Sequence, residues 1–239
     1  MIDRSQRIAA RVFAFTTLSS LILIMIAFTR WYAPFLVWEH EAETARNFAA
    51  HEGLVHLYLA AAVIYGLAMI AVLAALYVML RPIGRGLAFF AALTRLVYVV
   101  VWFIGLMDLF NALRIMTGKD SLHMFEADRL QALAGLQLAS GLDAYYIGLT
   151  CYAIASLVFA YLFFKSRYVP RVLAIWGILA SLFEGVCGFG YLVDRKFGMI
   201  VSPNWYEMPM MLFEVGASIW LLVRGLRPPE PAKTVPATS

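Results

Sequence analysis

Charged residues are scarce in this sequence. Only 14% of its 239 residues are Asp, Glu, Lys or Arg, whereas soluble domains average about 25%. In their place, 63% are hydrophobic, and apolar runs of about 20 residues, the length that crosses a bilayer core, recur along the chain. This composition excludes an ordinary soluble domain and predicts a polytopic membrane protein. The net charge of +4 does not indicate nucleic-acid binding, because the basic residues lie mainly between the apolar runs.

Cysteine and the usual catalytic signatures are rare or missing. Cys151 and Cys187 both fall inside apolar runs, where we expect free thiols and no disulfide. The chain contains no HExxH zinc motif, no nucleophile elbow and no glycine-rich phosphate loop. No internal repeat supports an inverted-repeat transporter. We therefore expect no cofactor and assign no metal, and whether the chain is an enzyme stays open.

The apolar runs predict an all-α bundle of six transmembrane spans that forms one domain over residues 1–227. The expected spans are 12–28, 54–80, 87–113, 142–164, 172–193 and 209–223. Between spans, residues 39–52 and 126–140 carry apolar side chains at three-and-four spacing, which predicts short amphipathic helices at the outer interface. The tail, 228–239, is rich in proline and polar residues and is expected to be disordered.

The distribution of basic residues predicts the orientation. An even number of spans puts both termini on one side of the membrane. The two termini and the loops on their side contain eleven Lys and Arg, against seven in the opposite loops. Because basic residues are retained on the cytoplasmic side, we expect both termini to be cytoplasmic.

Three charged residues lie deep inside predicted spans, away from the span ends. A lone arginine at mid-bilayer costs at least ~2.5 kcal/mol unless it finds a partner, so Arg95 needs one. At 1.5 Å per residue, Arg95 and Glu214 each lie about 15 Å from the cytoplasmic end of their span, and Glu184 lies about 20 Å from it. Opposite charges at one depth are natural partners, so we expect Arg95 and Glu214 to pair, with Glu184 as a third member.

The faces of two helices support this cluster. Tyr98 and Trp102 share a stripe with Arg95 and can offer it hydrogen bonds and a cation–π face. Small residues on the face of Glu184 predict close helix packing that turns its carboxyl inward; they are Gly177, Ser181 and Gly188. Such a cluster can fix helix register alone, or it can bind a ligand or proton. Both interpretations remain open.

A second group of polar residues is expected near the outer face, where all four histidines lie: His40, His51, His56 and His123. If the helix ends converge, His56 and Glu52 could meet Asp108, Asn111 and Asp143 in an outer polar pocket. Imidazole and carboxylates can hold Zn²⁺ and activate water. The alternative is that these are simply wetted groups at helix ends.

Three stretches carry a resemblance to a known family: LYVMLRPIGRGLAFF (76–90), FKSRYVPRVLAIWGILA (164–180) and EVGASIWLLVRG (214–225). In these, the chain resembles the bacterial membrane proteins of domain-of-unknown-function family 4386, over about residues 7–225. The resemblance implies six transmembrane helices in a bacterial inner membrane, and an Arg95–Glu214 pair that belongs to the shared architecture. It implies no activity. The chain departs from the family pattern at His56, where arginine is common, and at Ala62, where an acid is common.

Three function classes follow. The first is a non-catalytic membrane module that binds a lipid, a small apolar molecule or a membrane partner around Arg95, Glu184 and Glu214. The second is a metal-dependent membrane enzyme that uses the outer His/Asp group. The third is a proton or ion carrier, which needs a continuous polar path that the uncharged span 54–80 does not suggest. Membrane lipids are expected partners in every case.

Overall fold

The computed structural model describes residues 2–37, 40–118, 126–197, 201 and 203–226. Within these ranges all regular structure is helical, as predicted, and no strand occurs. A short 3₁₀ turn covers Ala33–Phe35. The described ranges contain seven α-helices: α1 (Arg4–Trp31), α2 (Glu41–Ala50), α3 (Glu52–Leu80), α4 (Arg85–Thr117), α5 (Ala127–Ser166), α6 (Arg171–Val193) and α8 (Pro203–Arg224).

Six of the described helices are long and apolar enough to cross a membrane, which confirms the predicted number of spans. They are all the described α-helices except α2. Large apolar side chains cover their outer surfaces; Phe15, Val172 and Val186, for example, are well exposed. In a membrane these surfaces contact lipid, since no water is there to penalise them.

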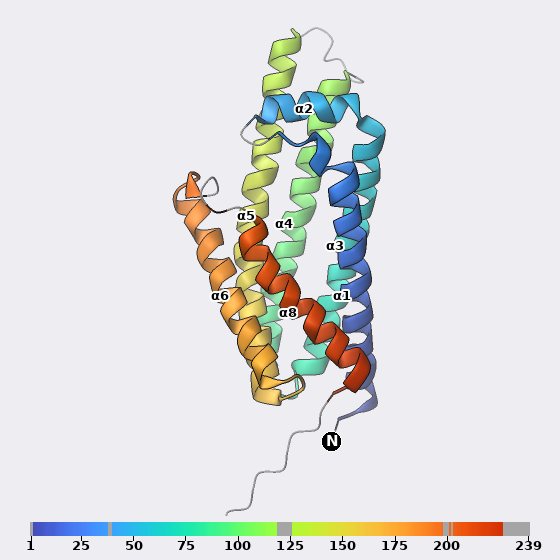
Figure 1. The fold of residues 1–239 in the computed structure, drawn as a ribbon, viewed down its shortest axis with the longest axis vertical. Helices are drawn as coiled ribbons and strands as arrows, with labels where there is room; N and C mark the ends of the chain where they lie inside the picture. Colours follow the sequence, from blue (N-terminus) through green and yellow to red (C-terminus); the bar gives the residue numbers. More distant parts are fainter. Residues whose placement is uncertain (1, 38–39, 119–125, 198–200, 202, 227–239) are drawn as a thin grey trace, which may run out of the picture.

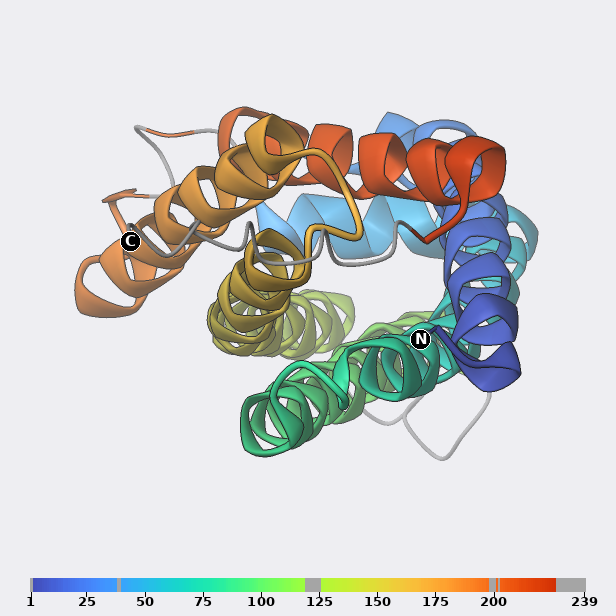
Figure 2. The ribbon, with the colours of Figure 1, turned by 90° about the horizontal axis from the view of Figure 1, so that it is seen from below.

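The six long helices form a closed ring. Each packs against the next in the order α1, α3, α4, α5, α6, α8, and α8 closes the ring against α1. Figure 1 shows α8 crossing the bundle diagonally from the α5 side to the foot of α1, and Figure 2 shows the ring from below. Both the start of α1 and the end of α8 lie at this lower end, while α2 lies across the upper part of the bundle (Figure 1). The interior of the ring is where the cluster of charged residues is found.

Helices α1 and α5 differ most from their predicted extents. The first helix begins at Arg4 and not near residue 12, because the Asp3 carboxylate accepts from the Gln6 backbone and the Gln6 side chain accepts from the Asp3 backbone. This capping box supplies partners for the free backbone N–H groups at the helix start. The predicted amphipathic helix at 126–140 is not separate, because it continues into the span 142–164 as one 40-residue helix, α5.

The other predicted amphipathic segment, 39–52, contains helix α2. It docks on the upper part of α5, where the Gln131 amide donates to the Ala42 carbonyl at 3.0 Å. Its position at a membrane interface stays a prediction. The tail 228–239 lies outside the described residues, so its expected disorder also stays a prediction.

Candidate functional site

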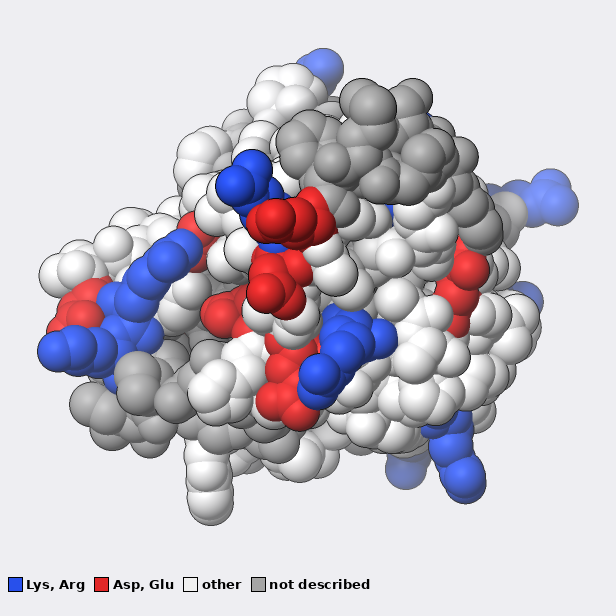
Figure 3. All heavy atoms as spheres, turned by 90° about the horizontal axis from the view of Figure 1, so that it is seen from above, with Lys and Arg blue, Asp and Glu red and all other residues white. Residues whose placement is uncertain are grey.

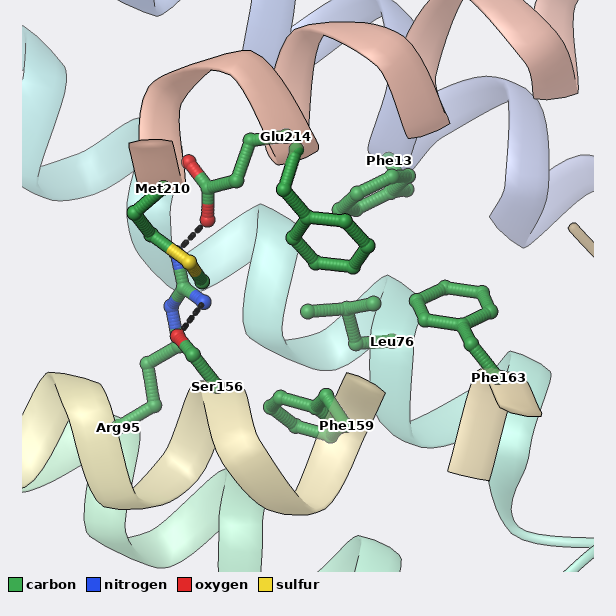
Figure 4. A pocket seen from close by; sticks show the side chains of 9 residues that line it. Phe13, Leu76, Arg95, Ser156, Phe159, Phe163, Met210 and Glu214 are labelled. Carbon is green, nitrogen blue, oxygen red and sulfur yellow. Dashed lines mark hydrogen bonds and ion pairs between the residues drawn. The ribbon is translucent and has the colours of Figure 1, made fainter. Parts of the chain in front are cut away.

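Arg95 lies at the centre of the ring and is 2% exposed. Its Nη2 donates to Oε1 of Glu214 at 2.7 Å, and its Nη1 donates to the Ser156 hydroxyl at 3.3 Å. Glu214 comes from α8 and Ser156 from α5, so the guanidinium joins three helices (Figure 4). The structure thus brings together the two charges that the depth estimate paired.

The aromatic ring beneath the guanidinium is that of Tyr152 on α5. The guanidinium carbon lies 4.2 Å from the centre of this ring, the distance of a cation–π contact. Tyr98 packs edge-on against Tyr152, with ring centres 5.0 Å apart. Trp102 lies further along α4 and donates from its indole nitrogen to the Ala62 carbonyl of α3 at 3.0 Å. Tyr98 therefore supports the ring that lies beneath the guanidinium, and Trp102 joins α4 to α3.

Sequence reasoning missed Tyr152 and Ser156. Both are polar groups in an apolar run, four residues apart and so on one helix face. That spacing was the available signal, but tyrosine and serine are common in membrane helices and do not by themselves indicate a site. Only their contacts with Arg95 identify them.

Glu184 is buried in α6, and one of its carboxyl oxygens has no hydrogen-bonding partner among the described residues. Its side chain is 2% exposed and its Oε2 receives no hydrogen bond. The charges of both Arg95 and Glu214 act on it. The small residues of its face pack as predicted: Gly177 lies under the Phe213 ring and Gly188 lies against Thr150. Glu184 therefore belongs to the same buried cluster.

A narrow cavity adjoins the ion pair (Figure 4). The space between its atoms amounts to about 230 Å³, part of it open to the outside, and leaves room for about one water molecule. Apart from the polar groups at one end, the lining is apolar and comes from five helices: Phe13, Leu76, Arg95, Ser156, Phe159, Phe163, Met210, Phe213 and Glu214. The cavity is thus an apolar space that ends at a buried charge pair.

Two of the predicted outer residues, His56 and Asp143, each have partners of their own. His56 contacts Glu52 at 3.2 Å on α3, and its ring meets Phe110 edge-on. Asp143 accepts from the Tyr191 hydroxyl at 3.1 Å and forms an ion pair with Arg195.

Asp143 therefore fastens α5 to the end of α6, and this hydrogen-bonded carboxylate raises the pKa of Arg195. Asp108 has one buried, unpartnered carboxyl oxygen, and Asn111 is half-buried one turn further along α4. No three His, Cys, Asp or Glu within the described ranges are grouped so as to hold a metal ion. His123 lies outside those ranges.

The arrangement as a whole offers charge and hydrogen-bonding groups inside an apolar cavity. Among the side chains that the structure describes around Arg95, none is a nucleophile hydrogen-bonded to a base. In comparison with known proteins, residues 4–225 match the family described as Domain of unknown function (DUF4386). No curated protein and no solved structure matches the chain.

Proposed function

The chain belongs to the family described as Domain of unknown function (DUF4386), whose description assigns no activity, and we propose on the geometry of the site that it is a non-catalytic membrane module. Its ligand is a small, mainly apolar molecule or a lipid chain, held with its polar end at Arg95 and Glu214. One observation carries this proposal: an apolar cavity inside the ring ends at a buried ion pair. Ligand sites typically combine an apolar lining with a few placed polar groups.

The cavity enlarges by side-chain movement. Phe213 and Met210 both line it from α8, and methionine in particular adopts many rotamers at low cost. Rotation of these two side chains admits a guest without separating the helices. The unpartnered Nε of Arg95 is then available to donate to the polar end of the guest.

The proposal places the module in the inner membrane of a bacterium, with both termini in the cytoplasm. The eleven basic residues assigned to the terminal side support this orientation. The opposite end, which carries α2, presents acidic side chains over its middle with basic side chains among them (Figure 3). Exposed acids there include Glu41, Glu126 and Asp128.

Native mass spectrometry of the full chain in mild detergent tests the proposal. We expect the wild type to carry a stoichiometric organic mass, and Leu76→Phe to lose it, because the larger ring fills the cavity that Leu76 lines. The control is Leu67→Phe on the same helix, where the side chain is 57% exposed and faces outward. It should retain the bound mass.

Two results would contradict the proposal. One is a Leu76→Phe variant that unfolds at the same temperature as the wild type and still carries the bound mass. The other is a wild type that carries no organic mass in detergent or in lipid nanodiscs. A stoichiometric metal would instead favour the enzyme hypothesis.

A further inference from the structure

Glu184 is a buried acid, and if it were ionised, no second cation among the described residues of the cluster would balance its negative charge. Buried side-chain oxygens in proteins almost always have hydrogen-bonding partners, and an exception needs an explanation. Oε2 of Glu184 is such an exception among the described residues. Arg95 is equally incomplete, since its Nε lacks a partner. An unsatisfied acid and an unsatisfied donor thus share one cluster.

The groups facing Glu184 come from every helix around it. Charge reaches it from Arg95 on α4 and Glu214 on α8. Tyr152 on α5 and Tyr206 on α8 interact with it electrostatically, as does Cys187 one turn further along α6. Among these groups there is one cation and there are two carboxyls.

A single guanidinium can neutralise a single carboxylate. A second ionised carboxylate, buried at this depth, would cost several kcal/mol. The ion pair at 2.7 Å assigns the cation to Glu214. Glu184 is therefore electrically balanced only if it carries a proton.

We propose that Glu184 and Glu214 form a proton-binding site in which the two carboxyls share one proton and Arg95 pairs with whichever is ionised. In the arrangement described, Glu184 holds the proton. When its O–H bond breaks and the proton passes to Glu214, the electron pair stays on Glu184 and Arg95 pairs with it. The net charge of the cluster is zero before and after this step. The exchange links α4 alternately to α8 and to α6, and it does not depend on a guest in the cavity.

Infrared spectroscopy of the full chain in bilayers at pH 7 tests the proposal, because a protonated carboxyl and a carboxylate absorb in separate bands. The wild type should show the band of one protonated carboxyl. Glu184→Gln, which resembles the protonated acid, should lose the band and unfold at the wild-type temperature. Glu207→Gln is the background for all of these variants, since Glu207 is a half-buried acid two turns before Glu214 on α8 and its own protonation would add to the band. The background alone should keep the band.

Glu214→Gln distinguishes a shared proton from an isolated acid. With Glu214 gone, Arg95 pairs with Glu184, which ionises, so this variant should also lose the band. If Glu214→Gln does not fold, Arg95→Gln is the alternative test. It should double the band, because both acids are protonated once the cation is gone. The proposal is overturned by a wild type without the band, by a band that survives Glu184→Gln, or by one that survives Glu214→Gln. A band unchanged in Arg95→Gln would overturn it too.

Discussion

Arg95 and Glu214 form a buried ion pair, in which the attraction between the two charges offsets the cost of removing each from water. Both are buried, at 2% and 6% exposed, and desolvating two ions can cancel much of the attraction between them. The pair therefore adds little net stability compared with two apolar side chains, but the loss of Arg95 leaves Glu214 buried without its cation. Its effect is to specify that α4 faces α8 across the ring.

The stability of single and double variants checks this account. Arg95→Met leaves Glu214 buried without a cation and should lower the free energy of unfolding by about 3–5 kcal/mol. Arg95→Met combined with Glu214→Leu should recover most of that loss, because no buried charge is then unpaired. Thermal unfolding in detergent, followed by circular dichroism, measures both.

The exposed pair of Glu43 and Arg46 provides the control. Its atoms are 3.5 Å apart and both side chains are about half exposed or more. Such surface pairs contribute about 0–1 kcal/mol, so Glu43→Ala should unfold close to the wild type. If Arg95→Met were as stable as Glu43→Ala, the pair would have no structural role.

Part of this site was accessible from the sequence. Arg95 and Glu214 could be paired by counting residues, because so few charges lie at that depth that each has few possible partners. Tyr152 and Ser156 could not be assigned, since many polar side chains in spans bond to their own helix; Thr94 and Ser181 do so here. The choice among them depends on side-chain positions that spacing does not determine.

Helices α5 and α6 pack through positions where a side chain would not fit. A Cβ built on Gly188 would lie 2.9 Å from the Thr150 hydroxyl, closer than such atoms normally approach. One turn earlier, a Cβ on Gly185 would meet only the Ala153 Cβ, at an ordinary 3.5 Å. Close approach of this kind strengthens the association of membrane helices, which gain little from hydrophobic burial against lipid.

These two glycines should respond differently to the same change. Gly188→Ala should destabilise the protein by about 1–3 kcal/mol, because it overpacks the α5–α6 contact. Gly185→Ala should be neutral or stabilise by up to about 1 kcal/mol, since alanine favours a helix over glycine. Thermal unfolding of both variants compares them directly.

A compensating change identifies the cause. Thr150→Ala removes the hydroxyl that the new methyl group would meet, so adding it to Gly188→Ala should restore stability. Equal destabilisation by Gly188→Ala and Gly185→Ala would show that the loss does not come from this contact.

The sequence predicted the number of spans correctly, but it predicted where each helix begins and ends less well. Runs without charge identify spans because a bilayer penalises any interruption. The join between 126–140 and 142–164 was not apparent. Gly141 lies inside α5, where a Cβ would come 3.4 Å from the Gly105 carbonyl oxygen of α4. Its role is therefore close packing, and not the end of a helix.

At the scale of the whole molecule, the six spans and their orientation can be tested together. In a background in which Cys151 and Cys187 are replaced, single cysteines at exposed positions report the side on which each end lies. We expect Glu41→Cys to react with a membrane-impermeant maleimide in intact cells. Ser5→Cys and Arg224→Cys should react only after lysis. The reverse pattern would place both termini outside the cytoplasm. If only one terminus reacted in intact cells, the termini would lie on opposite sides and the chain could not have six spans.

The order of helices around the ring was beyond sequence reasoning. Almost every span is apolar on all sides, so hydrophobicity does not distinguish a lipid-facing surface from a helix-facing one. The packing that closes the ring, such as the Trp176 indole nitrogen of α6 donating to the Pro209 carbonyl of α8 at 2.9 Å, depends on side-chain shape. The ring therefore became visible only with the structure.

The unbroken length of α5 has a structural consequence. At 1.5 Å per residue its 40 residues extend about 60 Å, roughly twice the thickness of a hydrocarbon core. The N-terminal end holds α2 through Gln131, and the C-terminal half carries Ser156 and Tyr152 against Arg95. The contact with α2 and the contacts with Arg95 therefore lie on one continuous helix, so α5 connects them directly.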